Sequence, residues 1–589
     1  MLLGFRIFLR GVIRVNKVFK TVPVALLTGA VFLGQAQTVF VRGNLAGYYP
    51  NAEKRIVLMS PADISASSWK ITDGSGATVA ENKVGRSIAG KSEHSPFSFN
   101  YEILFTNLNS EGDYLFLIDG SEPFPIKISK NPYEEAISAS LRWLRTQRSG
   151  SNDVLDRPPS HFGDSAVFIY YRSGDEMGDD WVEDEGGKTL DLQGGWYVGG
   201  NYTKSTGFIA YTTYSLLRAW NLAPQSFTKK YTQTDLVDII DEAKFGLDYL
   251  LKVMPNDKDF IINVGGYDAN NGTRLPHEDV LDGKRTAYSI NSSSDMALCA
   301  AALALGAETF KEIDTEFSEK CKAMAVKMFA RASSGQHSPQ WLDRDGWTLY
   351  PNPSDKDDLL LAAAELHKLT NEAKYLNKAK ELSDELPAAY WAGWEIQNMA
   401  AQLLIADKHS NARSVVQEDL NGFLSNQNSA GNIWNLPFTY TANGLYNCFI
   451  IGTAAGAYTK KFGDNNKYSN MALDVLNYNF GLNNWGVSFT ALRSIKQSVR
   501  RFFLPIYKLQ TRLFPEGATS IGPCDRANHD EQSKWILDDV RVNYCYPFNT
   551  SAVVFLDHEH DYMSMEARPD GAADNIYLMT LTNAVFGGK

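Results

Sequence analysis

One change of sequence period, near residue 131, constrains this chain more than any other feature. Before it, short β-prone runs are separated by turn clusters such as Asp73-Gly74-Ser75-Gly76. After Asn131-Pro132, apolar residues recur at helical spacing and continue to do so. Because a period of two indicates strands and a period of 3.6 indicates helices, the sequence predicts a small all-β unit followed by a much larger helical one.

The all-β unit is expected between residue 38 and about residue 130. Its β-prone runs and their spacing predict a sandwich of roughly seven short strands. The runs are 39–41, 55–58, 69–71, 97–99 and 114–118.

The helical part contains close to a dozen predicted helices joined by long polar loops, and we expect no strands between them. Thr234 is the predicted N-cap of the 234–254 helix. The pattern favours a helical barrel or an α-solenoid over an α/β fold, and the lack of a repeat of about 30–45 residues weighs against the solenoid. The expected helices are 133–145, 206–222, 234–254, 296–307, 357–369, 375–382, 394–406, 445–462, 467–480 and one after Asn549.

Residues 1–36 have the features of an export signal. A basic leader precedes the apolar run 22–34, and Gly34-Gln35-Ala36 supplies the small residues of a cleavage site. We therefore predict a periplasmic, cell-envelope or secreted protein, with an uncleaved N-terminal anchor as the alternative.

The net charge narrows the classes of partner, and the cysteines narrow the kinds of site and cross-link that we expect. The formal charge is -11, and removal of a leader with five basic and no acidic residues would make it -16. This acidity disfavours nucleic acid and anionic polymers and fits a neutral ligand. The five scattered cysteines support neither a zinc site nor a disulfide framework, so we expect buried free thiols.

A glycine-rich loop, 191–204, reads D-L-Q-G-G-W-Y-V-G-G-N-Y-T-K and precedes a predicted helix. Its glycines allow tight turns and close approach to a ligand. Stacking faces and a donor lie beside them, as a saccharide site requires. The predicted substrate-binding residues are Trp196, Tyr197, Tyr202 and Lys204.

This loop resembles the signature D-x-x-G-G-W-Y-D-A-G-D-Y-x-K-Y of the family-nine glycoside hydrolases, the cellulase family. Residues 44–54 are similar to the N-Q-V-G-Y-x-P-x-A-x-K start of the immunoglobulin-like domain that often precedes these enzymes. Segments 239–252, 358–366 and 476–483 also echo the family, in its order. The resemblance implies a mostly α chain: an immunoglobulin-like sandwich over 37–130 that buttresses an (α/α)6 barrel over 131–589.

The resemblance also implies a chemistry, namely hydrolysis of β-1,4-glucosidic bonds with inversion. An inverting enzyme needs a general acid and a general base about 6.5–9.5 Å apart. In the family the base is the second aspartate of D-A-G-D, assisted by the first, and these positions are Asn201 and Val198 here. The acid is the glutamate of N-E-V-x-x-x-x-N-A, which we match to 542–550 and which therefore falls on Asn543.

Other carboxylates are candidates to replace the missing groups. A shift of four or five residues brings Asp539 or Asp538 to the acid position. Asp191 and the acidic run 175–185 are candidates for the base, although such a run also fits a solvated surface or a weak calcium site. Apart from calcium, no metal or cofactor is expected.

Two further segments have more than one interpretation. Residues 493–512 interleave basic and apolar residues, which fits a solvated surface element, partly an amphipathic helix, or a patch facing a membrane or protein. The segment 557–561, D-H-E-H-D, fits a polar turn better than a strand carrying a chelating histidine pair.

Three hypotheses about function follow. The favoured one is a cleft that binds a β-glucan-type polysaccharide or oligosaccharide with little or no hydrolysis by the family mechanism. The alternatives are an active endoglucanase-type hydrolase with relocated carboxylates and an assembly component of an envelope polysaccharide system.

Overall fold

The computed structural model describes residues 39–156, 158–172, 180–200, 202–230, 234–265, 285–335, 350, 352, 354–438, 440–463, 467–503, 514–539 and 543–588, without the side chains of 534, 535 and 537–539. The predicted export signal, residues 175–179 of the acidic run and Asn201 therefore lie outside the described residues. Among the described helices, none is both long and apolar enough to cross a membrane.

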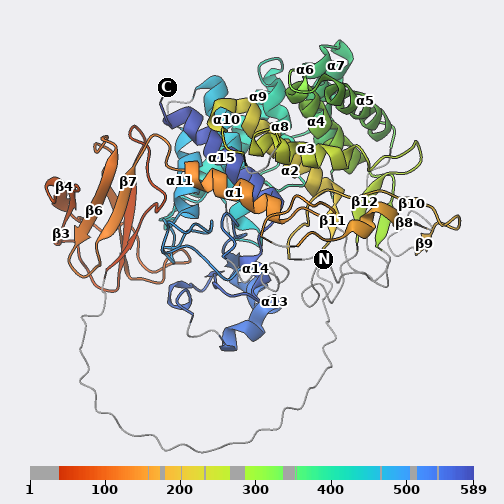
Figure 1. Ribbon diagram of the computed structural model, residues 1–589. Helices are drawn as coiled ribbons and strands as arrows, with labels where there is room; N and C mark the ends of the chain where they lie inside the picture. Colours follow the sequence, from red (N-terminus) through yellow and green to blue (C-terminus); the bar gives the residue numbers. More distant parts are fainter. Residues whose placement is uncertain are drawn as a thin grey trace, which may run out of the picture.

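The N-terminal unit is a two-sheet sandwich, as predicted (Figure 1). One sheet has the strand order β1-β2-β5 and the other β4-β3-β6-β7. In β6, Tyr114, Phe116 and Ile118 point into the core, whereas Asp113 and Leu115 are exposed, which is the alternation of a half-buried strand. The strands are β1 (Phe40–Arg42), β2 (Arg55–Ser60), β3 (Ser68–Thr72), β4 (Thr78–Lys83), β5 (Phe99–Leu104), β6 (Gly112–Ile118) and β7 (Phe124–Ile128).

The rest of the chain is a barrel of paired helices. Six inner helices pack in a closed ring in which each touches the next and the last touches the first. In order, they are α2 (Thr206–Leu222), α4 (Ser293–Phe310), α6 (Lys356–Thr370), α8 (Asn398–Ile405), α10 (Gly444–Phe462) and α15 (Pro569–Phe586). Nearly every residue of α4 and α15 is buried, as expected for helices covered on all sides.

An outer layer of helices covers this ring (Figure 1). In α7 the buried residues Tyr375, Ala379 and Leu382 recur at helical spacing, so one face contacts the ring and the other meets water. The outer helices are α1 (Glu134–Thr146), α3 (Asp238–Leu250), α5 (Thr315–Ala332), α7 (Ala373–Glu385), α9 (Ser410–Gln427) and α11 (Ser469–Asn479). The (α/α)6 barrel prediction is confirmed.

Some local predictions were wrong. A small sheet of order β10-β8-β13-β12-β11, with β9 beside β8, lies among the first barrel helices, where we expected no strands. Its strands are too short to show a period, and β13 pairs with the distant β8. They are β8 (Val167–Arg172), β9 (Trp181–Glu183), β10 (Thr189–Leu190), β11 (Lys204–Ser205), β12 (Ile261–Val264) and β13 (Thr286–Ser289).

One further correction concerns a helix start: the N-cap of α3 is Val237 rather than Thr234. Of the segment 493–512, residues 493–503 form turns and extended chain, with isolated bridges from Phe503 to Glu566 and from Ser498 to Ser488. Residues 504–512 lie outside the described residues, so the amphipathic-helix interpretation stays a prediction. The remaining elements are β14 (Cys524–Asp525), α13 (Arg526–Asp539), β15 (Val553–Val554) and α14 (Tyr562–Met565). All five cysteines are free and buried, as predicted.

The sandwich is joined to the barrel by buried polar contacts. The Arg55 guanidinium, 1% exposed, donates to Ile433 O at 2.6 Å and reaches Asp474 of α11 at 3.4 Å. Burial raises the pKa of Asp474 to about 6, and Arg55 opposes that rise. The Asn44 amide also donates to Tyr133 and to Asn477, both at 2.9 Å. The two units therefore share a buried interface rather than a flexible linker.

We expect Arg55→Met to lower the free energy of unfolding by about 3–5 kcal/mol, because Asp474 would lose its buried cation. The measurement is urea unfolding, followed separately by signals from the sandwich and from the barrel. Lys130→Met is the control, since its exposed pair with Glu111 spans 3.8 Å and is worth at most about 1 kcal/mol. Equal effects of the two substitutions would contradict this account of the interface.

Candidate functional site

The glycine-rich loop is attached to the end of α1 by backbone hydrogen bonds. Ser149 N donates to Gly195 O at 2.9 Å, and Tyr197 N donates to Gln147 O at 3.1 Å. Gly195 has φ +73°, and an added Cβ there would lie 2.7 Å from Ile209. Only glycine fits this turn, which places the loop directly above the start of α2.

A buried ion cluster fixes the other end of the loop. Lys204 Nζ lies 2.6 Å from Asp164 Oδ2 with both side chains 0% exposed, and Arg285 Nε lies 3.0 Å from Asp164 Oδ1. Burial raises the pKa of Asp164, but Arg285 and Lys204 outweigh it and hold that pKa below its usual value. Burial also lowers the pKa of Lys204, to about 8. Lys204 donates further to Leu192 O at 2.6 Å, so its ammonium ties the loop together.

The aromatic residues of the loop are also buried. Trp196, Tyr197 and Tyr202 are each 1% exposed. The Trp196 ring lies 5.8 Å from that of Phe245 on α3, and the Tyr197 hydroxyl hydrogen-bonds with Ser160 at 2.7 Å and with His161. Side chains buried in this way offer no stacking face.

The role of Trp196, Tyr197, Tyr202 and Lys204 as direct sugar contacts therefore stays a prediction. The structure gives all four another function, which is to shape and hold the loop. The side chains of the motif face inward, so the part of the loop that stays available to a ligand is its backbone.

Glu566 is the carboxylate that the structure brings against this loop. It lies just before α15, and its Oε1 is 3.5 Å from Gly200 N. A Cβ on Gly199 would lie 2.6 Å from the same oxygen, so glycine is what permits the approach. Burial raises the pKa of Glu566, and Arg568 only partly opposes this. A carboxylic acid with a raised pKa is the group that general acid catalysis requires.

The surroundings of Glu566 come from the starts of several inner helices. Arg568 forms a two-pronged ion pair with Asp570 at 2.9 and 3.1 Å, and its guanidinium carbon lies 5.3 Å from the ring of Phe208. That ring stacks on Trp394 at 4.2 Å, and Trp394 remains half-buried. A ring face and charged groups thus share this end of the barrel, a combination suited to carbohydrate.

Asp295, in the first turn of α4, is a second carboxyl group at the same end. Burial raises its pKa to about 6, although Ser292 donates to it at 2.6 Å. A Cβ on Gly207 would lie 2.6 Å from Asp295 and 3.0 Å from Trp394. Asp295 therefore lies beside the first turn of α2 and the Trp394 ring.

The three predicted catalytic positions have different surroundings in the structure. The Val198 side chain is apolar and 1% exposed, so it takes no part in proton transfer, whereas Asn201 lies outside the described residues. Asn543 is used locally, donating to Asp557 O at 3.0 Å and accepting from Cys545 N at 2.9 Å. The structure thus gives Asn543 a turn-forming role and places Glu566, rather than Asn543, against the loop.

The replacement carboxylates gain no support. Asp191 is exposed and pairs with Lys252 at 3.1 Å, and the side chains of Asp538 and Asp539 are outside the description. Residues 557–561 form a turn, as the polar-turn interpretation predicted, with Asp561 accepting from Ser564 at 2.6 Å. No cluster of three or more metal-ligating side chains occurs in the part of the chain described, so the calcium prediction stays untested.

Sequence reasoning missed Glu566, although a signal for it existed. In the register that places the glutamate of N-E-V-x-x-x-x-N-A on Glu566, the last alanine also matches, at Ala573, whereas Met565, Ala567 and Ala572 differ from the motif. Anchoring the motif on Asn549 ignored the helix that begins at Pro569. Requiring the motif to begin an inner helix would have selected Glu566.

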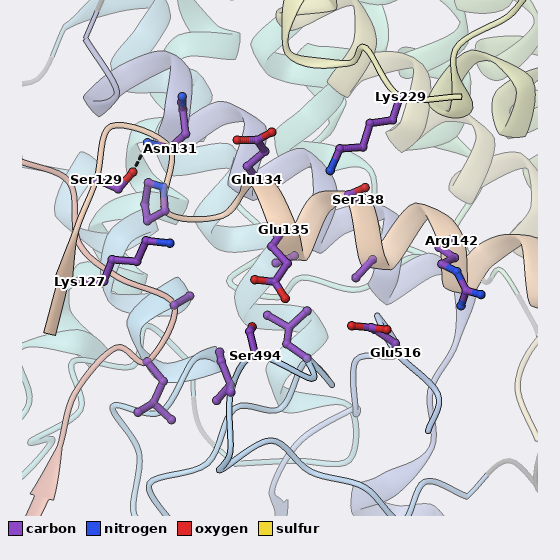
Figure 2. A pocket seen from close by; sticks show the side chains of 17 residues that line it. Lys127, Ser129, Asn131, Glu134, Glu135, Ser138, Arg142, Lys229, Ser494 and Glu516 are labelled. Atoms are coloured by element: carbon purple, nitrogen blue, oxygen red, sulfur yellow. Dashed lines mark hydrogen bonds between the residues drawn. The ribbon is translucent and has the colours of Figure 1, made fainter. Parts of the chain in front are cut away.

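A separate cavity lies away from this site. It measures about 750 Å³ and sits at the junction of the sandwich with α1 (Figure 2). Glu134, Glu135, Lys127 and Lys229 extend around it, and Figure 2 shows Glu135 directed toward Ser494. Because it holds neither an aromatic face nor Glu566, we assign it no part in the chemistry.

The fold is a barrel of paired helices with an accessory sandwich, and the candidate site lies at one end of its inner ring. Comparison with known proteins identifies the family: the profile of glycosyl hydrolase family 9 matches residues 133–579, and that of the cellulase N-terminal ig-like domain matches residues 36–123. The chain belongs to glycosyl hydrolase family 9.

Its relatives agree with this assignment. Endoglucanase 4 of Bacillus sp. (strain KSM-522) is 26% identical over 388 residues, which is 60% of this chain and 55% of that protein. Endoglucanase D of Acetivibrio thermocellus is 22% identical over 486 residues, covering 76% and 72%. The chain thus spans only about half the length of the first of these relatives.

Solved structures share the fold. A metagenome-derived family 9 endoglucanase superposes with a TM-score of 0.76 at 20% identity, covering 93% of this chain and 99% of that one. The Bacteroides ovatus GH9 structure gives 0.74 at 18% identity, covering 92% and 99%. At these identities the likeness concerns the fold alone.

We expect Lys204→Met to destabilise the protein by about 3–5 kcal/mol, because it removes one cation of a buried cluster and leaves Leu192 O without its donor. Lys252→Met is the matched control, since Lys252 follows α3 and its pair with Asp191 of the loop is exposed and worth at most about 1 kcal/mol. Thermal unfolding followed by circular dichroism measures both. Similar melting temperatures for the two variants would contradict the anchoring role of Lys204.

Proposed function

We propose that this protein binds a β-1,4-glucan-type polysaccharide at the N-terminal end of the inner ring, with Glu566 as the general acid beside the scissile bond. The observation that carries the proposal is the contact of Glu566 with Gly199 and Gly200 in the loop. Burial raises the pKa of Glu566, which favours the protonated form that a general acid needs. The half-buried Trp394 supplies a ring face nearby. Export, which residues 1–36 predict, would bring the protein to such a ligand.

We further propose that hydrolysis is slow because the general base is missing. Val198 is apolar, and the amide at Asn201 accepts no proton near neutral pH. A positioned acid or base typically contributes a factor of about 10²–10⁴ to the rate. The protein would retain one half of the inverting machinery, which revises the expectation from Asn543 that the acid was lost as well.

An active hydrolase with a relocated base is the second candidate, and Asp295 is the observation in its favour. Its pKa of about 6 would leave it largely ionised at neutral pH, as a base requires. It lies beside Trp394 and the first turn of α2. Activity of the unmodified protein that Asp295→Asn abolishes would establish this alternative.

Restoring the base is the direct test of the first proposal. We expect the unmodified protein to bind soluble β-glucan with little release of reducing ends. The Val198→Asp/Asn201→Asp variant should gain activity by about 10²-fold or more. Adding Glu566→Gln should remove that gain while glucan binding persists. The matched control is Val198→Asp/Asn201→Asp/Asn543→Gln, which should keep the gain if Asn543 only forms a turn. A gain that survives Glu566→Gln would contradict the assignment of the acid.

The pH dependence of the base-restored variant gives a separate check. The Glu566 acid acts only when protonated, and its pKa is raised. The alkaline limb of kcat/KM should therefore lie above the range of an ordinary glutamate, with activity falling as the pH rises through that pKa. An alkaline limb at an ordinary glutamate pKa, about 4.3, would contradict the placement of Glu566 in a desolvated position.

A further inference from the structure

A second cavity lies at the other end of the inner ring. It measures about 550 Å³ and is lined by the C-terminal halves of α2, α4 and α6 together with α8, α10 and α15. Tyr577 of α15 lies in its wall, seven residues beyond Asp570, which is roughly 10 Å along the helix axis. The cavity is therefore separate from the site around Glu566.

Arg218 is the unusual residue of this cavity. Its guanidinium carbon lies 4.3 Å from the ring centroid of Tyr577 and 5.5 Å from that of Tyr214. Within the described residues it makes no hydrogen bond or ion pair, so its five N–H donors have no protein acceptor. Two tyrosine rings hold the group in place, which lowers the entropy lost when a ligand binds.

The carboxylates near Arg218 are already engaged. Glu365 accepts from Tyr214 at 2.8 Å and lies 3.7 Å from Lys368. Asp574 accepts from both Tyr211 and Ser215, at 2.9 and 3.0 Å. Asp574 attracts Arg218 electrostatically, but no hydrogen bond joins them among the described residues, so the donors of the half-buried guanidinium are open to an acceptor on a ligand.

The charge of the lining favours an anion. Arg218, Lys368, Lys408 and Lys461 are set against only Glu365 and Asp407, a net of two positive charges in a chain whose formal charge is -11. Lys461 pairs with Asp407 at 2.6 Å, and Lys408 donates to His367 at 3.2 Å. The C-terminal helix ends add partial negative charge, and Asp574 lies close enough to attract Arg218, but neither Arg218 nor Lys408 forms a carboxylate ion pair among the described residues.

Apolar side chains also line the cavity, beside the polar Asn221 and Asn371, and they favour a ligand with an apolar face. Leu222, Leu305, Leu403, Leu404 and Ile405 form one wall. Arginine recognises a carboxylate through two parallel hydrogen bonds, and the apolar wall suits the C–H face of a sugar ring. We propose that this cavity is a binding site for an acidic sugar of the hexuronic acid type, with its carboxylate on Arg218.

The test is isothermal titration of the full chain with glucuronate, with glucose and inorganic phosphate as comparison ligands. We expect saturable binding of glucuronate, at least tenfold weaker binding of glucose, and weak binding of phosphate. The ligand has two sources, a free hexuronic acid and the end of a polyuronate chain. Titration with an oligoglucuronate distinguishes them, because a free sugar fills the cavity alone whereas a polymer must present its end. Phosphate binding as tight as glucuronate would overturn the sugar assignment, and absence of glucuronate binding would overturn the site.

Two variants and a control locate the binding. Arg218→Gln should weaken glucuronate binding at least tenfold, and Lys408→Gln, at an exposed position that does not threaten folding, should weaken it a few-fold. Arg413→Gln is the matched control, since Arg413 also lies on an aromatic ring, Phe462 at 4.3 Å, but outside this cavity. Unchanged binding in both cavity variants would overturn the proposal. Because β-glucan binding near Glu566 is measured separately, failure of either site is distinguishable from failure of the other.

Discussion

The buried cluster of Asp164, Lys204 and Arg285 is the constraint on which the site depends. Three charged groups removed from water are costly unless each finds its partners. Here Asp164 receives both cations, Lys204 also reaches two backbone carbonyls, and Arg285 donates to Tyr202 O at 2.9 Å. The only geometry that satisfies all three groups also fixes the glycine-rich loop over the start of α2. Its value to the protein lies in specifying one conformation more than in adding stability.

That conformation gives the site an asymmetric chemistry. Gly199 and Gly200 have no side chains, so the backbone approaches the Glu566 carboxyl group, and the desolvation that follows favours its protonated form. On the loop itself, Val198 contributes only a buried methyl surface. The loop backbone thus lies against the Glu566 carboxyl group, but at Val198 the loop offers no side-chain acceptor for the proton of a water molecule. A fold can keep a binding geometry while a single proton acceptor is lost, because the two depend on different atoms.

Much of this architecture could be predicted from the sequence, for identifiable reasons. The helix 206–222 was predicted with its observed bounds because its apolar residues repeat over many turns. The exposed edge strand β4, T-V-A-E-N-K, was missed because it buries no side chain and so shows no alternation. The small sheet was missed because pairing such as that of β13 with β8 joins segments far apart in the sequence. Local patterns carry no record of such contacts.

The candidate site, like the fold, could be predicted from the sequence only in part. The loop motif predicted a loop whose conformation depends on glycine, and Gly195, at φ +73°, bears this out. It did not predict that the aromatic residues are buried, because composition alone does not distinguish a ring that packs on Phe245 from one that faces a ligand. Glu566 was missed because the motif was aligned by an asparagine rather than by the helix it should begin.

Closure of the inner ring has a consequence for how the chain acquires its structure during synthesis. The apolar surface of α2 is covered by α15, whose first residue, Pro569, is made long after Leu222. At a translation rate of about 5–20 residues per second, that surface waits for roughly 20–70 s for its partner. Nascent chains must therefore be shielded from aggregation over this interval. Since Glu566 immediately precedes α15, the last event that completes the ring is also the one that brings the Glu566 carboxyl group to the loop.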